Sequence, residues 1–175
     1  MRGDLDSAIE KYRKGVDLSK GKELEPLLSL LRLLLVKGDF KEIVDNYREI
    51  IKGYSDNFKV NLYYWIAYFY INPEEFSYKS FRNRLKRFED EPTLDCWIAT
   101  LEYRLKNNKN LARKIINRIL SRGGRVIECY NLLISIYCDE GNYDKAEKLY
   151  REIKGMIKEE YLKEYFKKML KACGK

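Results

Sequence analysis

The sequence predicts an all-α fold made of repeated helix–turn–helix segments. Similar phrases begin at Gly3, Gly38, Asn72, Asn107 and Gly141, at intervals of 35, 34, 35 and 34 residues. Five residues after each start the side chain is small in four of the five cases, and nine residues after it the side chain is large and apolar. These two columns are Ala8, Ile43, Ser77, Ala112 and Ala146, and then Tyr12, Tyr47, Phe81, Ile116 and Tyr150. A period of about 34 residues is typical of helical repeat proteins and takes precedence over segment-by-segment assignment.

Each phrase predicts a tight corner between two helices. Glycine, or asparagine as its usual substitute, adopts the left-handed conformation that ends a helix. The residue that follows, Asp4, Asp39 or Asn142, is expected to cap the next helix by accepting its free amide protons. In the third phrase Pro73 follows Asn72 and suits a first helical turn, where its missing N–H has no partner.

Apolar side chains at helical spacing precede each corner. We therefore expect helices over 24–37, 58–71, 93–106 and 127–140. The helices that follow the corners are expected over 4–18, 39–53, 73–88, 108–121 and 142–156. An amphipathic segment, 161–173, suits a helix that covers the end of a stack of repeats.

The phrase GNYDKAEKLY at 141–150 resembles the corner of the tetratricopeptide repeat (TPR) family, in which Gly-Asp-Tyr is followed by alanine and then an aromatic residue. The resemblance implies a right-handed α–α superhelix, or solenoid, forming one domain over 1–175 with about four and a half repeats. The repeats are a half repeat at 1–23, full repeats at 24–57, 58–92, 93–126 and 127–160, and a capping helix at 161–173. The half repeat leaves two alternatives open: part of a longer array, or a lone N-terminal cap.

Catalytic chemistry has little support in the sequence. The chain contains no histidine, so the commonest acid–base and triad chemistry is absent. Gly123 and Gly124 lack the frame of a phosphate-binding loop. We therefore expect a non-enzyme with no catalytic residue, no cofactor and no bound metal.

Four cysteines occur, and none belongs to a C-x-x-C pair. Buried reduced thiols are the favoured interpretation, and a Cys96–Cys129 disulfide is the alternative if the source is a hyperthermophile. The two longest apolar runs, 27–36 and 60–71, are shorter than a membrane span, and the first residues lack the apolar core of a signal peptide. These features favour a cytoplasmic location.

The TPR resemblance implies a groove lined by the first helix of each repeat. The partner-binding positions that it implies here are Leu28, Arg32, Leu35, Leu62, Ile66, Phe69, Tyr70, Trp97, Leu101 and Arg104. The corresponding positions of the fourth repeat include Ser135, Cys138 and Asp139 and are polar. An exposed apolar stripe of this size usually marks a partner site, and an amphipathic helix or extended apolar segment is the natural ligand. Two other interpretations stay open: curvature buries these residues, or the protein's own terminal helix fills the groove.

Charge supplies a rival hypothesis. Residues 58–125 hold 14 basic and 7 acidic residues, whereas residues 1–57 hold 11 of each. A possible patch for nucleic acid or an acidic partner comprises Lys79, Arg82, Arg87, Arg113, Arg118, Arg122 and Arg125. Solvated helix faces carry such side chains commonly. We therefore expect a protein-binding scaffold or adaptor, with RNA or single-stranded DNA binding as the alternative. The partner's identity and the oligomeric state, including a homo-oligomer, stay open.

Overall fold

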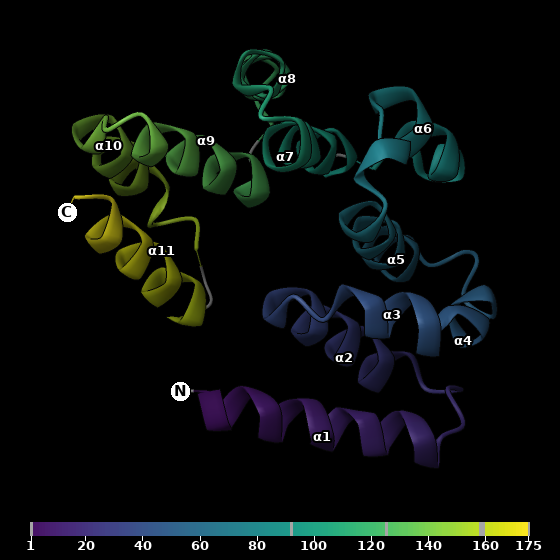
Figure 1. The fold of residues 1–175 in the computed structure, drawn as a ribbon. Coiled ribbons are helices and arrows are strands. Elements are labelled where there is room, and N and C mark those ends of the chain that lie inside the picture. The colour runs from purple at the N-terminus through teal and green to yellow at the C-terminus, as the bar shows by residue number, and fades with distance from the viewer. Residues whose placement is uncertain (1, 92, 125, 158–159, 175) are drawn as a thin grey trace. The chain divides into compact units, whose positions relative to one another are not determined.

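The computed structural model describes residues 2–91, 93–124, 126–157 and 160–174, and among them there is no β-strand. The all-α prediction is confirmed at this level (Figure 1). The chain divides into two compact units, Met1–Glu89 and Asp90–Lys175, here called the N-terminal and C-terminal units. That the whole chain acts as one domain stays a prediction.

The N-terminal unit packs α1 (Arg2–Leu18), α2 (Leu24–Lys37), α3 (Phe40–Asn46) and α5 (Phe58–Ile71) around one core. Shorter elements complete it, namely α4 (Arg48–Lys52), the 3₁₀ turn η1 (Pro73–Glu75), α6 (Tyr78–Arg84) and the 3₁₀ turn η2 (Lys86–Phe88). Leucines of α2 at helical spacing point into the core and have no exposed surface: Leu27, Leu30, Leu31 and Leu34. Helix α5 is apolar on all sides, which is the pattern of a helix buried on more than one face.

The C-terminal unit contains two helix hairpins and a terminal helix. One hairpin is α7 (Leu94–Lys106) with α8 (Lys109–Ser121), and the other is α9 (Ile127–Asp139) with α10 (Tyr143–Ile153). Helix α11 (Glu160–Cys173) packs on α9 and α10 (Figure 1). The helices predicted before the corners agree with α2, α5, α7 and α9 to within one residue.

The two recurring columns lie mostly in the cores. Ala112 and Ala146 have no exposed surface, and neither do Phe81 and Ile116. Small side chains let the paired helices approach closely, and the large ones fill the space one turn later. Ser77 is the exception in the small column, since it is exposed.

Three corners use the left-handed conformation as predicted. The φ angle is +88° at Gly38, +52° at Asn107 and +70° at Gly141. The prediction is wrong for Asn72, whose φ is −129°. Asn72 precedes Pro73, and the proline ring confines the preceding residue to the extended region.

Side-chain capping differs from the prediction at two corners. Asp39 and Asn142 occupy N-cap positions, but neither side chain makes a capping hydrogen bond. The Asp39 carboxylate instead pairs with Lys37 at 3.0 Å. Asn108 does cap its helix, because its side-chain oxygen accepts from the Leu111 amide at 3.2 Å. Gly3 and Asp4 lie within α1, which begins at Arg2, so the predictions of a corner and of an N-cap there are wrong.

Two predicted single helices are interrupted. The segment 73–88 divides into η1, α6 and η2 because Ser77 begins a new helix through a reciprocal capping box with Ser80. The segment 39–53 divides at Tyr47 into α3 and α4. Backbone hydrogen bonds from Tyr47 to Ile43 and from Ile51 to Tyr47 continue across this point, so the chain bends there without opening.

Candidate functional site

In the N-terminal unit, the predicted groove residues of α2 form a partly exposed strip. Leu28 and Leu35 are half-buried against the core, and Arg32 is exposed. Val36, the residue after Leu35, has a large apolar side chain that is 73% exposed. The α2 strip, defined as Leu28, Arg32, Leu35 and Val36, therefore offers apolar surface around a cation.

The predicted groove residues of α5 lie deeper. Leu62, Ile66 and Phe69 are at most 2% exposed. The Phe69 ring packs on Phe76 and Phe81 within the same unit, with centroids 5.4 and 5.7 Å apart. Partner contact at Leu62, Ile66 and Phe69 therefore stays a prediction, and their side chains serve the packed interior in this structure.

Tyr70 is the partly exposed member of the α5 set. Its ring stacks on Phe40 of α3 at a centroid distance of 4.3 Å and an interplanar angle of 13°. Helix α5 also carries Trp65, and the Arg84 guanidinium lies 4.6 Å from the centre of the Trp65 ring. Aromatic surface on this helix is thus held in fixed positions by neighbouring side chains.

In the C-terminal unit, α7 contributes Trp97, Leu101 and Arg104. Trp97 is half-buried and Leu101 has no exposed surface. Arg104 is exposed, and its guanidinium lies 5.3 Å from the centre of the Tyr103 ring. Partner contact at Leu101 stays a prediction for the same reason as at the buried residues of α5.

A cleft of 540 Å³ joins Arg104 to the fourth-repeat groove positions of α9 and to α11. Its lining comprises Arg104, Ser135, Cys138, Asp139, Tyr165, Lys168, Met169, Ala172 and Cys173. Three of these residues, Ser135, Cys138 and Asp139, are among the α9 positions to which the repeat register assigns the groove. The protein's own terminal helix therefore lies beside these positions, with an open cleft between them.

Contacts between α11 and α9 reach these positions directly. The Ser135 hydroxyl donates a hydrogen bond to the Met169 sulfur at 3.4 Å. Cys138 and Cys173 form a disulfide, with their Cα atoms 4.9 Å apart. The sequence analysis missed this pair. Its signal was the helical spacing of Phe166, Met169 and Cys173, which places Cys173 on the apolar side of α11.

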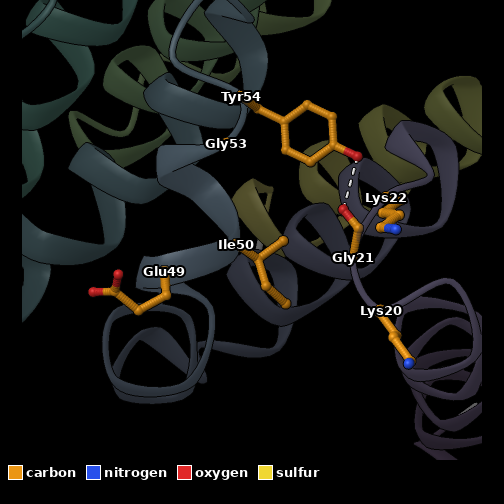
Figure 2. A pocket seen from close by; sticks show the side chains of 7 residues that line it. All are labelled: Lys20, Gly21, Lys22, Glu49, Ile50, Gly53 and Tyr54. Atoms are coloured by element: carbon orange, nitrogen blue, oxygen red, sulfur yellow. Dashed lines mark hydrogen bonds between the residues drawn. The ribbon is translucent and has the colours of Figure 1, made fainter.

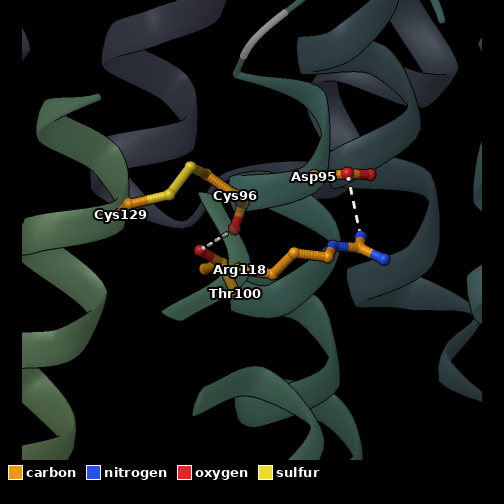
Figure 3. Close-up of a disulfide and its surroundings, with 5 residues drawn as sticks. All are labelled: Asp95, Cys96, Thr100, Arg118 and Cys129. Atoms are coloured by element: carbon orange, nitrogen blue, oxygen red, sulfur yellow. Dashed lines mark hydrogen bonds and ion pairs between the residues drawn. A yellow bond between two sulfur atoms is a disulfide. The ribbon is translucent and has the colours of Figure 1, made fainter. Parts of the chain in front are cut away.

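A second disulfide joins α7 to α9 (Figure 3). Cys96 and Cys129 have no exposed surface, and their Cα atoms lie 5.1 Å apart. Beside them the Thr100 hydroxyl donates to the Cys96 carbonyl at 2.9 Å. The Cys96–Cys129 disulfide was the alternative interpretation of the sequence, and the favoured interpretation, reduced thiols, is wrong for these two cysteines.

Several of the predicted basic residues are engaged within the chain. Arg87 pairs with Asp56 at 2.7 Å. Figure 3 shows a second pair, Arg118 with Asp95 at 3.2 Å. Arg113 pairs with Glu140 at 2.6 Å. The hydrogen bond from Arg113 lowers the pKa of the Glu140 carboxyl.

The remaining basic residues differ in their surroundings. The Arg82 guanidinium lies 5.5 Å from the centre of the Tyr78 ring. Lys79 and Arg122 are exposed, whereas Arg125 lies outside the described residues. The predicted basic positions are thus distributed over both units, and three of them bridge one helix or loop to another.

A second open pocket, also of 540 Å³, lies between the α1–α2 loop and α4 in the N-terminal unit (Figure 2). The Tyr54 hydroxyl donates to the Gly21 carbonyl at 2.8 Å across this pocket. Gly21 has φ +71°, and a Cβ added there would lie 2.6 Å from Cγ2 of Ile50. The hydrogen bond and the close approach of Gly21 to Ile50 therefore hold the α1–α2 loop against α4 and the residues after it.

The described part of the chain contains neither a cluster of metal-ligating residues nor a membrane-spanning helix. Residues of the ligating types do not gather there in groups of three or more. No described helix is long and apolar enough to span a bilayer.

The sequence pattern of the PPR repeat matches residues 128–156, which comprise most of α9 and all of α10. PPR repeats are TPR-like helical repeats that mediate binding to protein or RNA, and proteins built from them are generally non-catalytic. The matched segment lies in 127–160, the repeat that most resembles the TPR pattern. Comparison with curated proteins and with solved structures returned no match.

Proposed function

We propose that this protein is a non-enzymatic scaffold of the TPR-like solenoid class that binds an amphipathic helical segment of a partner protein. The observation that carries the proposal is the position of α11. This amphipathic helix lies against the α9 positions that the repeat register assigns to the groove, and it contacts them through Met169 and Cys173. An amphipathic helix of a partner protein can make the same kind of contacts with these α9 positions.

The α2 strip is the surface that we assign to an external partner in the N-terminal unit. Val36 is largely exposed and Leu28 and Leu35 are partly exposed, so apolar area is available without rearrangement. A preformed helix face leaves most of the ordering entropy to the incoming segment.

Nucleic-acid binding is the second candidate. The PPR match and the formal net charge of +8 favour it. The ion pairs of Arg87, Arg113 and Arg118 oppose it, because each of these guanidiniums already has a carboxylate partner. A phosphate would have to replace that carboxylate, so we rank the protein partner first.

Peptide binding tests the proposal. A library of amphipathic helical peptides is screened against the wild-type protein and against R32E/V36E. The matched control is K14E/L18E on α1, which also replaces one basic and one aliphatic residue, both exposed, at the same four-residue spacing. We expect R32E/V36E to weaken a bound peptide by about tenfold or more, as a loss at a binding hot spot does, and the control to leave it unchanged.

The outcome also separates the two candidates. Single-stranded RNA is titrated at two salt concentrations against the wild type and K79E/R122E. Salt-sensitive RNA binding that this variant abolishes, together with no peptide bound, would replace the protein partner by nucleic acid. Equal loss of peptide in R32E/V36E and K14E/L18E would remove the assignment to the α2 strip.

A further inference from the structure

The two disulfides of the C-terminal unit lie in opposite environments. Cys96 and Cys129 are fully buried between α7 and α9. Cys138 and Cys173 are partly exposed and line the cleft between α9 and α11. Thiol–disulfide exchange requires a thiolate to reach a sulfur atom. An external dithiol therefore has access to Cys138–Cys173 in the folded protein and not to the buried pair.

The accessible disulfide holds the far end of α11. Cys173 is the last residue of the helix, and the chain joins the helix at its other end, after α10. With the disulfide formed, α11 is tied at both ends. Without it, α11 is tied at one end only.

Among the described side chains of α11, from Lys163 onward, Phe166 and Leu170 are the buried ones. Phe166 and Leu170 are 1% and 6% exposed, and the Phe166 ring stacks on Tyr150 at 5.8 Å. Tyr165 lines the cleft between α9 and α11 and is 47% exposed, and the neighbouring Lys167 and Lys168 are exposed too. A helix of 14 residues is marginal in water without such packing, so α11 depends on these contacts and on the disulfide to stay docked.

The surface under α11 is apolar. Phe166 and Leu170 belong to one core cluster with Ile134, Ile153 and Ile157. We call these three isoleucines, with Ser135 and Cys138, the α11 seat. Departure of α11 would uncover a row of isoleucines that an amphipathic helix can cover again.

We propose that the Cys138–Cys173 disulfide is a redox latch: it locks α11 onto its seat, and its reduction opens the seat to a helix of the α11 pattern from a partner. The pattern is an aromatic residue followed by apolar residues three and four positions later. Reduction by a dithiol breaks the bond between the two sulfur atoms. Two electrons and two protons pass from the dithiol to Cys138 and Cys173, and the dithiol becomes a disulfide. The inference rests on the proposed function, because it identifies one seat and its control.

Amide hydrogen exchange tests the latch itself. The oxidised full chain, the same chain after brief dithiothreitol treatment and the variant C138S/C173S are compared. We expect exchange in residues 163–173 to accelerate by about tenfold or more on loss of the latch, while α7 and α9 stay protected by the buried disulfide. Unchanged exchange in α11 would overturn the proposal.

Binding in trans tests the seat. The probe is a fluorescent peptide of residues 160–175 carrying C173S, which prevents covalent capture. In the latched protein α11 is tied at both ends and competes for the seat more strongly than in C138S/C173S, where it is tied at one end, so the latched protein should bind the probe at least about tenfold more weakly. A peptide that also carries F166A/L170A is the matched control and should not bind. Should C138S/C173S not fold, the briefly reduced wild type gives the same comparison.

The outcomes distinguish this inference from the proposed function. Equal binding of the probe in both redox states would overturn the latch and leave helix binding standing. Absence of binding to the opened protein would overturn the seat, whereas the peptide screen on the α2 strip tests the proposed function independently.

Discussion

Replacing Cys96 and Cys129 by alanine should destabilise the C-terminal unit strongly. This disulfide joins α7 to α9 across a sequence separation of 33 residues. A cross-link of that loop length lowers the entropy of the unfolded chain and contributes about 3.7 kcal/mol. Both cysteines are fully buried, so removal of the two sulfur atoms adds a packing loss of about 1 kcal/mol or more.

Urea unfolding without reductant measures this loss. The chain has two tryptophans, Trp65 and Trp97, and Trp97 lies in α7. In a W65F background, tryptophan fluorescence therefore reports on the C-terminal unit. We expect C96A/C129A to lose about 4 to 5 kcal/mol against the parent. After full reduction, the free energies of unfolding of C96A/C129A and of its parent should be similar. A loss below about 1 kcal/mol without reductant would refute the reasoning, because an unbonded pair imposes no constraint on the unfolded chain.

Two further changes have expected sizes. The pKa of Glu140 is lowered in the folded state by Arg113, so the pair stabilises the fold above the unfolded-state pKa and loses this effect as pH falls through the folded-state pKa. Urea unfolding of E140Q should therefore show a loss of about 0.5 kcal/mol near neutral pH and none in strong acid, and an equal loss at both would contradict this origin. Thermal or urea unfolding of G21A should show a loss of about 2 kcal/mol or more, since Gly21 has φ +71° and its Cβ would meet Ile50. The control G141A should lose about 1 kcal/mol, because φ is also positive but nothing lies within 4 Å; equal losses would remove the role of the contact.

Helix positions were predictable because they depend on period and apolar spacing. Once the corners fixed the register, the boundaries of α2, α5, α7 and α9 followed to within one residue. The left-handed corners at Gly38, Asn107 and Gly141 followed from backbone preference alone.

The errors arose where a local interaction competes with the repeat pattern. Pro73 removes the left-handed option from Asn72, and Ser77 starts a helix of its own through Ser80. The repeat register contains neither of these effects. Asp39 is a residue type that caps helices, but its carboxylate pairs with Lys37 instead. The ion pair and the capping hydrogen bond stabilise by similar amounts, so residue type alone does not decide between them.

The candidate site was predictable in register but not in exposure. Arg32 and Arg104 lie on exposed surface as a groove requires, whereas Phe69 and Leu101 are buried. A sequence position on a helix face does not say how many neighbours cover that face. The Cys138–Cys173 pair was missed because the packing of α11 on α9 joins residues 35 positions apart, and spacing alone gives no such contact.

Isoleucine methyl NMR tests the central claim, helix binding on the groove side of α9, most directly. The C138S/C173S protein is labelled at isoleucine methyl groups and titrated with the 160–175 peptide carrying C173S. We predict shifts at Ile134, Ile153 and Ile157, which belong to the α11 seat, and none at Ile9 in the N-terminal unit. Titration that leaves the three seat methyl groups unmoved, or that moves Ile9 instead, would contradict the account.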